Sequence, residues 1–113
     1  MSRASGLSSE ALAADWLAQR GFRILERNFT VKGGELDLVC DQDGTLVFVE
    51  VRARKDARHG APEETISAAK RRRIILAARL YLLMRGIEDR ACRFDVVAIE
   101  GGAITHIPDA FTA

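Results

Sequence analysis

The sequence predicts a single α/β domain built on a mixed sheet of four or five strands with helices on its faces. Its 113 residues suit one domain. Helical spacing of apolar residues marks two segments, and two-residue alternation or continuous apolar runs mark the segments between and after them. The predicted order is helix, strand, strand, strand, helix, strand, strand.

The first predicted element is a helix over residues 8–20. Ser8 or Ser9 can cap its N-terminus, and Gly21 can end it. Two pairs spaced i, i+4 can face a core: Leu12 with Trp16, and Ala13 with Leu17. An amphipathic helix of this kind is expected to cover one face of the sheet.

Three strands are predicted next, over residues 22–29, 35–41 and 45–52. A turn at residues 32–34 and a loop at residues 42–45 join them. Both connections are too short for a crossover, so the three strands should form an antiparallel meander. The third is apolar on both faces until its end, which is typical of a central strand.

A long helix is predicted from about residue 63 to residue 85, with Pro62 in its first turn and Gly86 after its end. Its expected buried stripe comprises Ile66, Ala69, Ile74, Ala77, Tyr81 and Met84. A buried strand over 92–99 and a short strand over 103–107 follow. Because the long helix joins the third strand to the fourth, a right-handed crossover should make these two parallel.

Composition excludes several classes of protein. The chain is 48% hydrophobic and 29% charged, which disfavours disorder, and its apolar runs are too short to span a membrane. Residues 1–7 lack the apolar core of a signal peptide and are expected to be a flexible tail before a domain at 8–113. We therefore expect a cytoplasmic protein without a membrane partner. Cys40 and Cys92 show no metal or redox spacing.

Charge is distributed unevenly although the net charge is only +1. Charged residues in 34–51 are all acidic, whereas those in 52–79 are mostly basic. Acidic side chains can hold a divalent cation, and a basic surface can hold phosphates. Solvated surface charge is the plainer interpretation, and composition does not choose between the two.

Strand parity and register bring two of the acids together. A hairpin that pairs Asp41 with Leu46 keeps matching faces opposite each other. The same register places Asp37 opposite Glu50. Carboxylates about 5 Å apart across a ladder raise one another's pKa, so their proximity requires a partner.

Two partners are possible for this acidic pair. A divalent cation would neutralise both carboxylates. Alternatively, the register sets Glu35 opposite Arg52, which would give a cross-strand cluster satisfied by arginine. Asp95, in the fourth strand, is expected to pair with Arg93 or another arginine rather than to bind a metal.

Four segments carry a resemblance to a known family: GELDLV at 34–39, VFVEVRAR at 47–54, RFDVV at 93–97 and DAF at 109–111. In this order they resemble the YraN-like family of small bacterial proteins, which belongs to the PD-(D/E)XK, or restriction-endonuclease-like, superfamily. The resemblance implies a core of helix, three strands, helix and strand. It also implies Mg²⁺-dependent hydrolysis of phosphodiester bonds in DNA, including branched or damaged DNA by analogy with archaeal Holliday-junction resolvases.

The resemblance also implies roles for individual residues. Asp37 and Glu50 match the metal-binding acids, with the carbonyl of Val51 as a further ligand to Mg²⁺ or Mn²⁺. Glu10 resembles the additional acid of the archaeal resolvases. Independently of the resemblance, Glu35 can either supplement the metal site or hold Arg52, and the register favours the second.

One position departs from the superfamily pattern, because Arg52 stands where the signature has lysine. Arginine keeps its proton and cannot act as a general base, although it can position phosphate. Lys70 on the long helix could offer the missing ammonium if its side chain reached the sheet. A solvated patch at residues 70–73 is the default expectation for it.

Candidate phosphate contacts share a positive charge and follow the third strand: Arg54, Lys55, Arg58, Lys70 and Arg71, with His59 in support. DNA is the partner that they suggest. A nucleic-acid-binding module without catalysis is the second interpretation, and a protein-interaction module is the third. A homodimer is conceivable, but no feature of the sequence supports it.

Overall fold

A computed structural model describes residues 8–54 and 66–113, and it confirms the predicted α/β class and element order. The predicted tail and Pro62 lie outside these residues. The helices are α1 (Ser9–Ala18) and α2 (Ala68–Met84). The strands are β1 (Arg23–Val31), β2 (Gly34–Gln42), β3 (Thr45–Arg54), β4 (Cys92–Glu100) and β5 (Ala103–Phe111).

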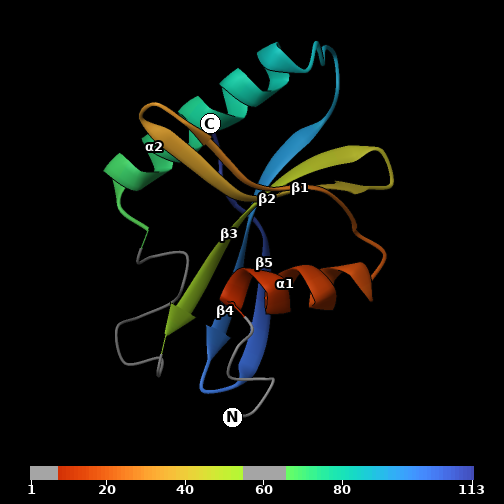
Figure 1. Ribbon diagram of the computed structural model, residues 1–113, viewed down its shortest axis with the longest axis vertical. Helices are drawn as coiled ribbons and strands as arrows, with labels where there is room; N and C mark the ends of the chain where they lie inside the picture. Colours follow the sequence, from red (N-terminus) through yellow and green to blue (C-terminus); the bar gives the residue numbers. More distant parts are fainter. Residues whose placement is uncertain (1–7, 55–65) are drawn as a thin grey trace.

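All five strands form one sheet in chain order, β1-β2-β3-β4-β5 (Figure 1). As predicted, β3 and β4 are parallel, because α2 carries the chain from one to the other. The remaining neighbours are antiparallel. The central strand β3 is therefore hydrogen-bonded on both sides.

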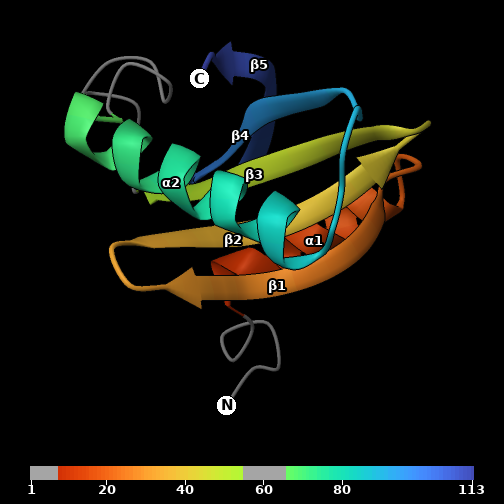
Figure 2. The same ribbon diagram turned by 90° about the horizontal axis from the view of Figure 1, so that it is seen from above.

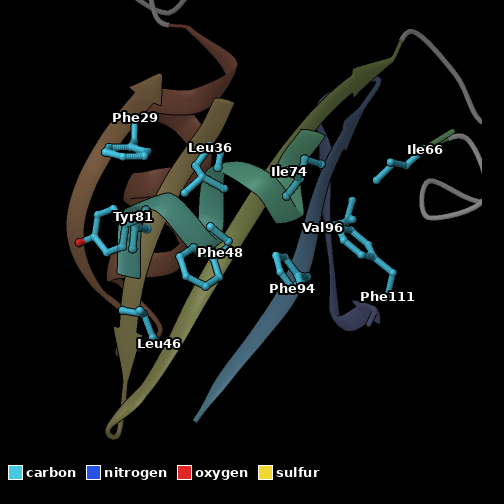
Figure 3. Packing of buried hydrophobic residues seen from close by; sticks show 13 residues of the cluster. Phe29, Leu36, Leu46, Phe48, Ile66, Ile74, Tyr81, Phe94, Val96 and Phe111 are labelled. Carbon is cyan, nitrogen blue, oxygen red and sulfur yellow. The ribbon is translucent and has the colours of Figure 1, made fainter. Parts of the chain in front are cut away.

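The two helices cover opposite faces of the sheet (Figure 2). Alternation along β3 divides the core, because Phe48 packs on the α2 side with Tyr81, and Val49 packs on the α1 side with Leu17. Aromatic and aliphatic side chains fill the α2 side (Figure 3). Both layers are needed to bury a strand that is apolar on both faces.

The β2–β3 hairpin has the predicted register, with Asp41 paired to Leu46. Its turn is shorter than the predicted four-residue loop, because Gln42 and Thr45 also pair. The turn residues Asp43 and Gly44 have φ values of 49° and 92°. This is the Asp-Gly preference of a two-residue hairpin with left-handed backbone at both positions.

The predicted ladder between β2 and β3 is wrong beyond its middle. Pairing ends at Leu38 and Val49, after which the two strands separate (Figure 1). Two pairs predicted from the register are therefore not formed: Asp37 with Glu50, and Glu35 with Arg52. The separation leaves a fork in the sheet beneath α2.

The long helix starts later than predicted. Ser67, rather than Pro62, is next to its first turn, and its hydroxyl accepts a hydrogen bond from Lys70 N at 3.1 Å. Most of the predicted stripe is buried, but Ala69 and Met84 are exposed. In the described part of the chain, no helix is long and apolar enough to cross a membrane.

The last strand is longer than the predicted 103–107 and includes Pro108. Proline is tolerated here because β5 is an edge strand. The extension brings Phe111 onto Phe94, with ring centroids 4.9 Å apart. In α1 the predicted core residues Ala13 and Leu17 are buried, whereas Leu12 is exposed.

Helix α2 lies very close to the sheet at Gly34. A Cβ at this position would lie 2.3 Å from the carbonyl oxygen of Arg73 and 3.2 Å from Cβ of Ala77. The first of these neighbours is backbone, so the helix itself would have to move. The glycine therefore fixes the distance between α2 and the fork.

Gly34→Ala should destabilise the fold by about 1–3 kcal/mol, because it overpacks a contact that cannot relax through a side chain. Urea denaturation measures this loss, with Lys32→Ala in the exposed β1–β2 turn as the control. A Gly34→Ala protein as stable as wild type would contradict the close helix–sheet contact.

Candidate functional site

The fork between β2 and β3 opens into a cavity of about 190 Å³ beneath α2. Three acids from the strands and two cations from the helix line it, together with one apolar side chain: Glu35, Asp37, Glu50, Lys70, Arg73 and Ile74. The structure thus brings together three of the acids that the sequence analysis singled out, Glu35, Asp37 and Glu50. Their proximity arises from the fork rather than from the predicted cross-strand pairing.

Asp37 and Glu50 form the floor of this cavity and are nearly inaccessible, with 8% and 5% of their surfaces exposed. Oδ2 of Asp37 accepts a hydrogen bond from Val51 N at 2.8 Å. A continued ladder would have directed that N–H to the backbone of β2, so the carboxylate replaces a strand contact. Burial and the adjacent Glu50, with which it shares a side-chain hydrogen bond, raise the pKa of Asp37 to about 7, against the opposing effect of Val51 N–H.

Lys70 reaches into the cavity and places its Nζ 2.7 Å from Oε2 of Glu50. The expectation of a solvated position is therefore wrong for Lys70, although 39% of its side chain remains exposed. The sequence contained a signal for this orientation. Lys70 precedes Ile74, Ala77 and Tyr81 at helical spacing, and these three are buried against the sheet.

Two residues predicted to be catalytic are not among those lining the cavity. Arg52 lies two positions after Glu50 on β3 and is half-buried. Glu10 lies on α1, and the apolar residues of α1 pack on the face of the sheet opposite α2. Val51 contacts the acidic pair through its backbone N–H, which donates to Asp37.

The acidic side of the cavity fits a small, hard cation. Asp37 and Glu50 supply carboxylate oxygens, and the exposed Glu35 stands on the same wall. No group of three or more His, Cys, Asp and Glu side chains close enough to hold an ion occurs in residues 8–54 and 66–113. Mg²⁺ does not require such a group, because it commonly binds one or two carboxylates and keeps several waters.

The predicted phosphate contacts are dispersed. Arg54 is 10% exposed and pairs with Glu100 on β4, with its Nε 2.7 Å from Oε2. The guanidinium of Arg71 lies 5.5 Å from the ring centroid of Phe111. Lys55, Arg58 and His59 lie outside the described residues. Arg73, which sequence analysis did not single out, does line the cavity.

Asp95 is a buried acid of a different kind, on the α1 side of the sheet. It accepts hydrogen bonds from Arg93 Nε at 2.9 Å and Asp109 N at 2.9 Å, and it lies 2.7 Å from Nε2 of His106. Burial would raise the pKa of Asp95, but the hydrogen bonds from His106, Arg93 and Asp109 outweigh it and lower that pKa below its ordinary value. The predicted pairing of Asp95 with Arg93 is confirmed.

These two acids predict opposite effects of pH on stability. The pKa of Asp37 is raised on folding from 3.8 to about 7, so its protonated form is favoured in the fold and stability declines as pH rises through this range. Asp37→Asn should remove this decline and stabilise the protein at about pH 8 relative to wild type.

Asp95→Asn should instead destabilise the protein at neutral pH by about 2 kcal/mol or more, because Asp95 is ionised and satisfied in the fold. Since the pKa of Asp95 is lowered, this loss should shrink as pH falls through the acid range. Urea denaturation at several pH values measures both variants. Parallel pH profiles for Asp37→Asn and wild type would contradict the raised pKa of Asp37.

Comparison of the sequence with known proteins identifies the family of this chain. A family model described as "Uncharacterised protein family UPF0102" matches residues 9–99. A UPF0102 protein of Chromohalobacter salexigens is 54% identical over 100 residues, covering 88% of this chain and 80% of that protein. Relatives with the same description occur in Anaeromyxobacter dehalogenans (50% identical; 96% of this chain, 84% of the relative) and Symbiobacterium thermophilum (47% identical; 90% and 86%). The chain therefore belongs to UPF0102, the family that the four sequence segments predicted under the name YraN-like.

Proposed function

We propose that this protein hydrolyses phosphodiester bonds in DNA with a Mg²⁺ ion held by Asp37 and Glu50. The observation that carries the proposal is the burial of two adjacent carboxyl groups at the floor of an open, charged cavity. Two buried, neighbouring carboxylates repel each other and destabilise the fold unless a cation neutralises their charge. Lys70 supplies one positive charge, and a divalent ion supplies two.

Each lining residue has a role in this proposal. Asp37 and Glu50 hold the ion, and the family resemblance adds the carbonyl of Val51. When bound, the ion would supply activation of water and neutralisation of charge on the phosphate. Val51 N–H keeps the carboxylate of Asp37 directed at the cavity. Mn²⁺ is expected to substitute for Mg²⁺.

Lys70 is a better candidate than Arg52 for the superfamily's lysine. It offers an ammonium inside the cavity from α2, whereas Arg52 does not line it. An ammonium is a compact point charge with three donors, which can orient a water or a phosphate oxygen. Although Arg52 replaces the superfamily's lysine, Lys70 still provides an amine next to the two acids.

The surface of α2 supports a nucleic-acid substrate. The helix has no acidic residue, and three of its arginines are exposed: Arg72, Arg73 and Arg79. Arg73 also lines the cavity, so the cationic surface continues into the candidate site. A phosphate backbone is the polyanion that such a surface would attract.

A binding module without catalysis is the second candidate. The 2.7 Å contact between Lys70 and Glu50 favours it, because the lysine already compensates one of the two acids. In that case the cavity would be a stable ion pair, and DNA would bind on α2 alone. Metal-dependent cleavage separates the two candidates.

Asp37→Asn and Glu50→Gln should each abolish Mg²⁺- or Mn²⁺-dependent nicking of DNA, because they remove metal-binding charge while nearly preserving shape. The assay offers four-way junctions, flaps and single strands with and without the ion. Asp43→Asn in the exposed β2–β3 turn is the matched control and should cleave as wild type does.

DNA binding by the two acid variants should persist or strengthen, since an anion near the phosphates has been removed. If wild-type protein binds every substrate and cleaves none, the nuclease proposal fails and the binding module replaces it. Unfolding of both acid variants would instead identify the carboxylates as structural partners of cations.

Arg72→Ala and Arg73→Ala should weaken DNA binding and flatten its salt dependence, by about one unit of log–log slope for each lost phosphate contact. Fluorescence anisotropy across a salt series measures the slope. Arg27→Ala on the exposed face of β1 serves as the control. Equal slopes for all three variants and wild type would show that DNA does not lie along α2.

A further inference from the structure

We infer that the Lys70 ammonium and the divalent cation compete for Glu50, and that a phosphodiester relieves this competition by drawing Lys70 toward itself beside Arg73. Metal and phosphodiester would then bind cooperatively. The inference rests on the metal site of the proposed function. It adds an anion-binding pair, Lys70 with Arg73, and a coupling between the binding of the metal ion and the binding of the phosphodiester.

The contact geometry establishes the competition. Nζ of Lys70 lies 2.7 Å from Oε2 of Glu50, and that carboxylate is 5% exposed. A Mg²⁺ ion at about 2.1 Å from the same group would share a confined, poorly solvated space with the ammonium. Two cations repel strongly there, so the ion is favoured only when Lys70 withdraws.

Lys70 is able to withdraw. Its side chain is an unbranched stem near the N-terminus of α2, and 39% of it is exposed. The acids opposite it are buried, so they are less able to move. Of the two sides of the ion pair, the helix side is therefore the adjustable one.

Arg73 gives the withdrawn ammonium a place to act. It follows Lys70 by three residues on α2, so their side chains project from neighbouring positions on the helix surface, and both line the cavity. A phosphate between them would accept charge-assisted hydrogen bonds from both. The cavity would then have an acidic wall for the ion and a basic wall for the phosphate.

Reciprocity makes the inference quantitative. If the phosphodiester removes Lys70 from Glu50 and so favours the ion, the ion must favour the phosphodiester by the same factor. Couplings of this kind are typically about 5- to 150-fold. Removal of the Lys70 charge should give the metal its higher affinity at once and abolish most of the coupling.

Mn²⁺ titration with detection of the free ion by electron paramagnetic resonance tests the inference. The proteins are wild type, Lys70→Met, Lys70→Gln and the control Lys32→Met, which removes the same charge from an exposed turn. Each is titrated with and without a short DNA duplex. The Glu50→Gln protein with the same duplex measures Mn²⁺ held by DNA alone.

Without DNA, both Lys70 variants should bind Mn²⁺ at least about fivefold more tightly than wild type and Lys32→Met. DNA should tighten Mn²⁺ binding to wild type by a similar factor and change the Lys70 variants little. The glutamine variant retains a neutral donor to Glu50, so it keeps the test valid should Lys70→Met fail to fold.

Two results would overturn the inference in distinguishable ways. If folded Lys70 variants and wild type bind Mn²⁺ equally, the metal site stands and the competition is wrong. If none of these proteins binds Mn²⁺, with or without DNA, the metal site fails and the inference fails with it.

Discussion

The burial of two neighbouring carboxyl groups, Asp37 and Glu50, is the constraint on which the rest of this site depends. Where β2 leaves β3, the ladder hydrogen bonds end, and a side chain takes over from the backbone: Asp37 accepts the N–H of Val51. Burial, and then the charge of the neighbouring Glu50, raise the pKa of Asp37. Lys70, on the α2 wall of the cavity, reduces the repulsion between the two carboxylates. The close contact of α2 with Gly34 holds this helix in position.

Asp95 shows that burial alone does not produce such a site. It is completely buried, yet Arg93, His106 and the backbone of Asp109 satisfy it, and its pKa is lowered. The family segments therefore have two purposes. RFDVV and DAF build a satisfied network and an aromatic stack between β4 and β5, whereas GELDLV and VFVEVRAR supply the acids of the cavity.

The sequence predicted those features that depend on residues close together in the chain or on the length of a connection. Alternation predicted the faces of β3, the Asp43-Gly44 turn was consistent with the hairpin register, and the long connection predicted the parallel β3–β4 pair. In β2 the alternation is only partly followed, because Leu36 packs with Val39 on the α2 side, whereas Leu38 and Cys40 pack on the α1 side. Sequence reasoning failed where tertiary packing decided. The fork cannot be read from the regular apolar alternation of residues 35–41, which the structure breaks between Leu36 and Leu38. The last strand is longer than predicted because it lies at a sheet edge, where Pro108 is tolerated. Lys70 could have been placed from its helical spacing, but its position in a run of four cations favoured a solvated face.

Mn²⁺ bound in a crystal of this protein, located by its anomalous scattering, would test the central claim most directly. The account predicts an anomalous peak between the carboxylates of Asp37 and Glu50, at about 2.1–2.2 Å from their oxygens, with the Lys70 ammonium displaced from Glu50. A crystal grown at saturating Mn²⁺ with no peak in this cavity and Lys70 still paired to Glu50 would contradict it.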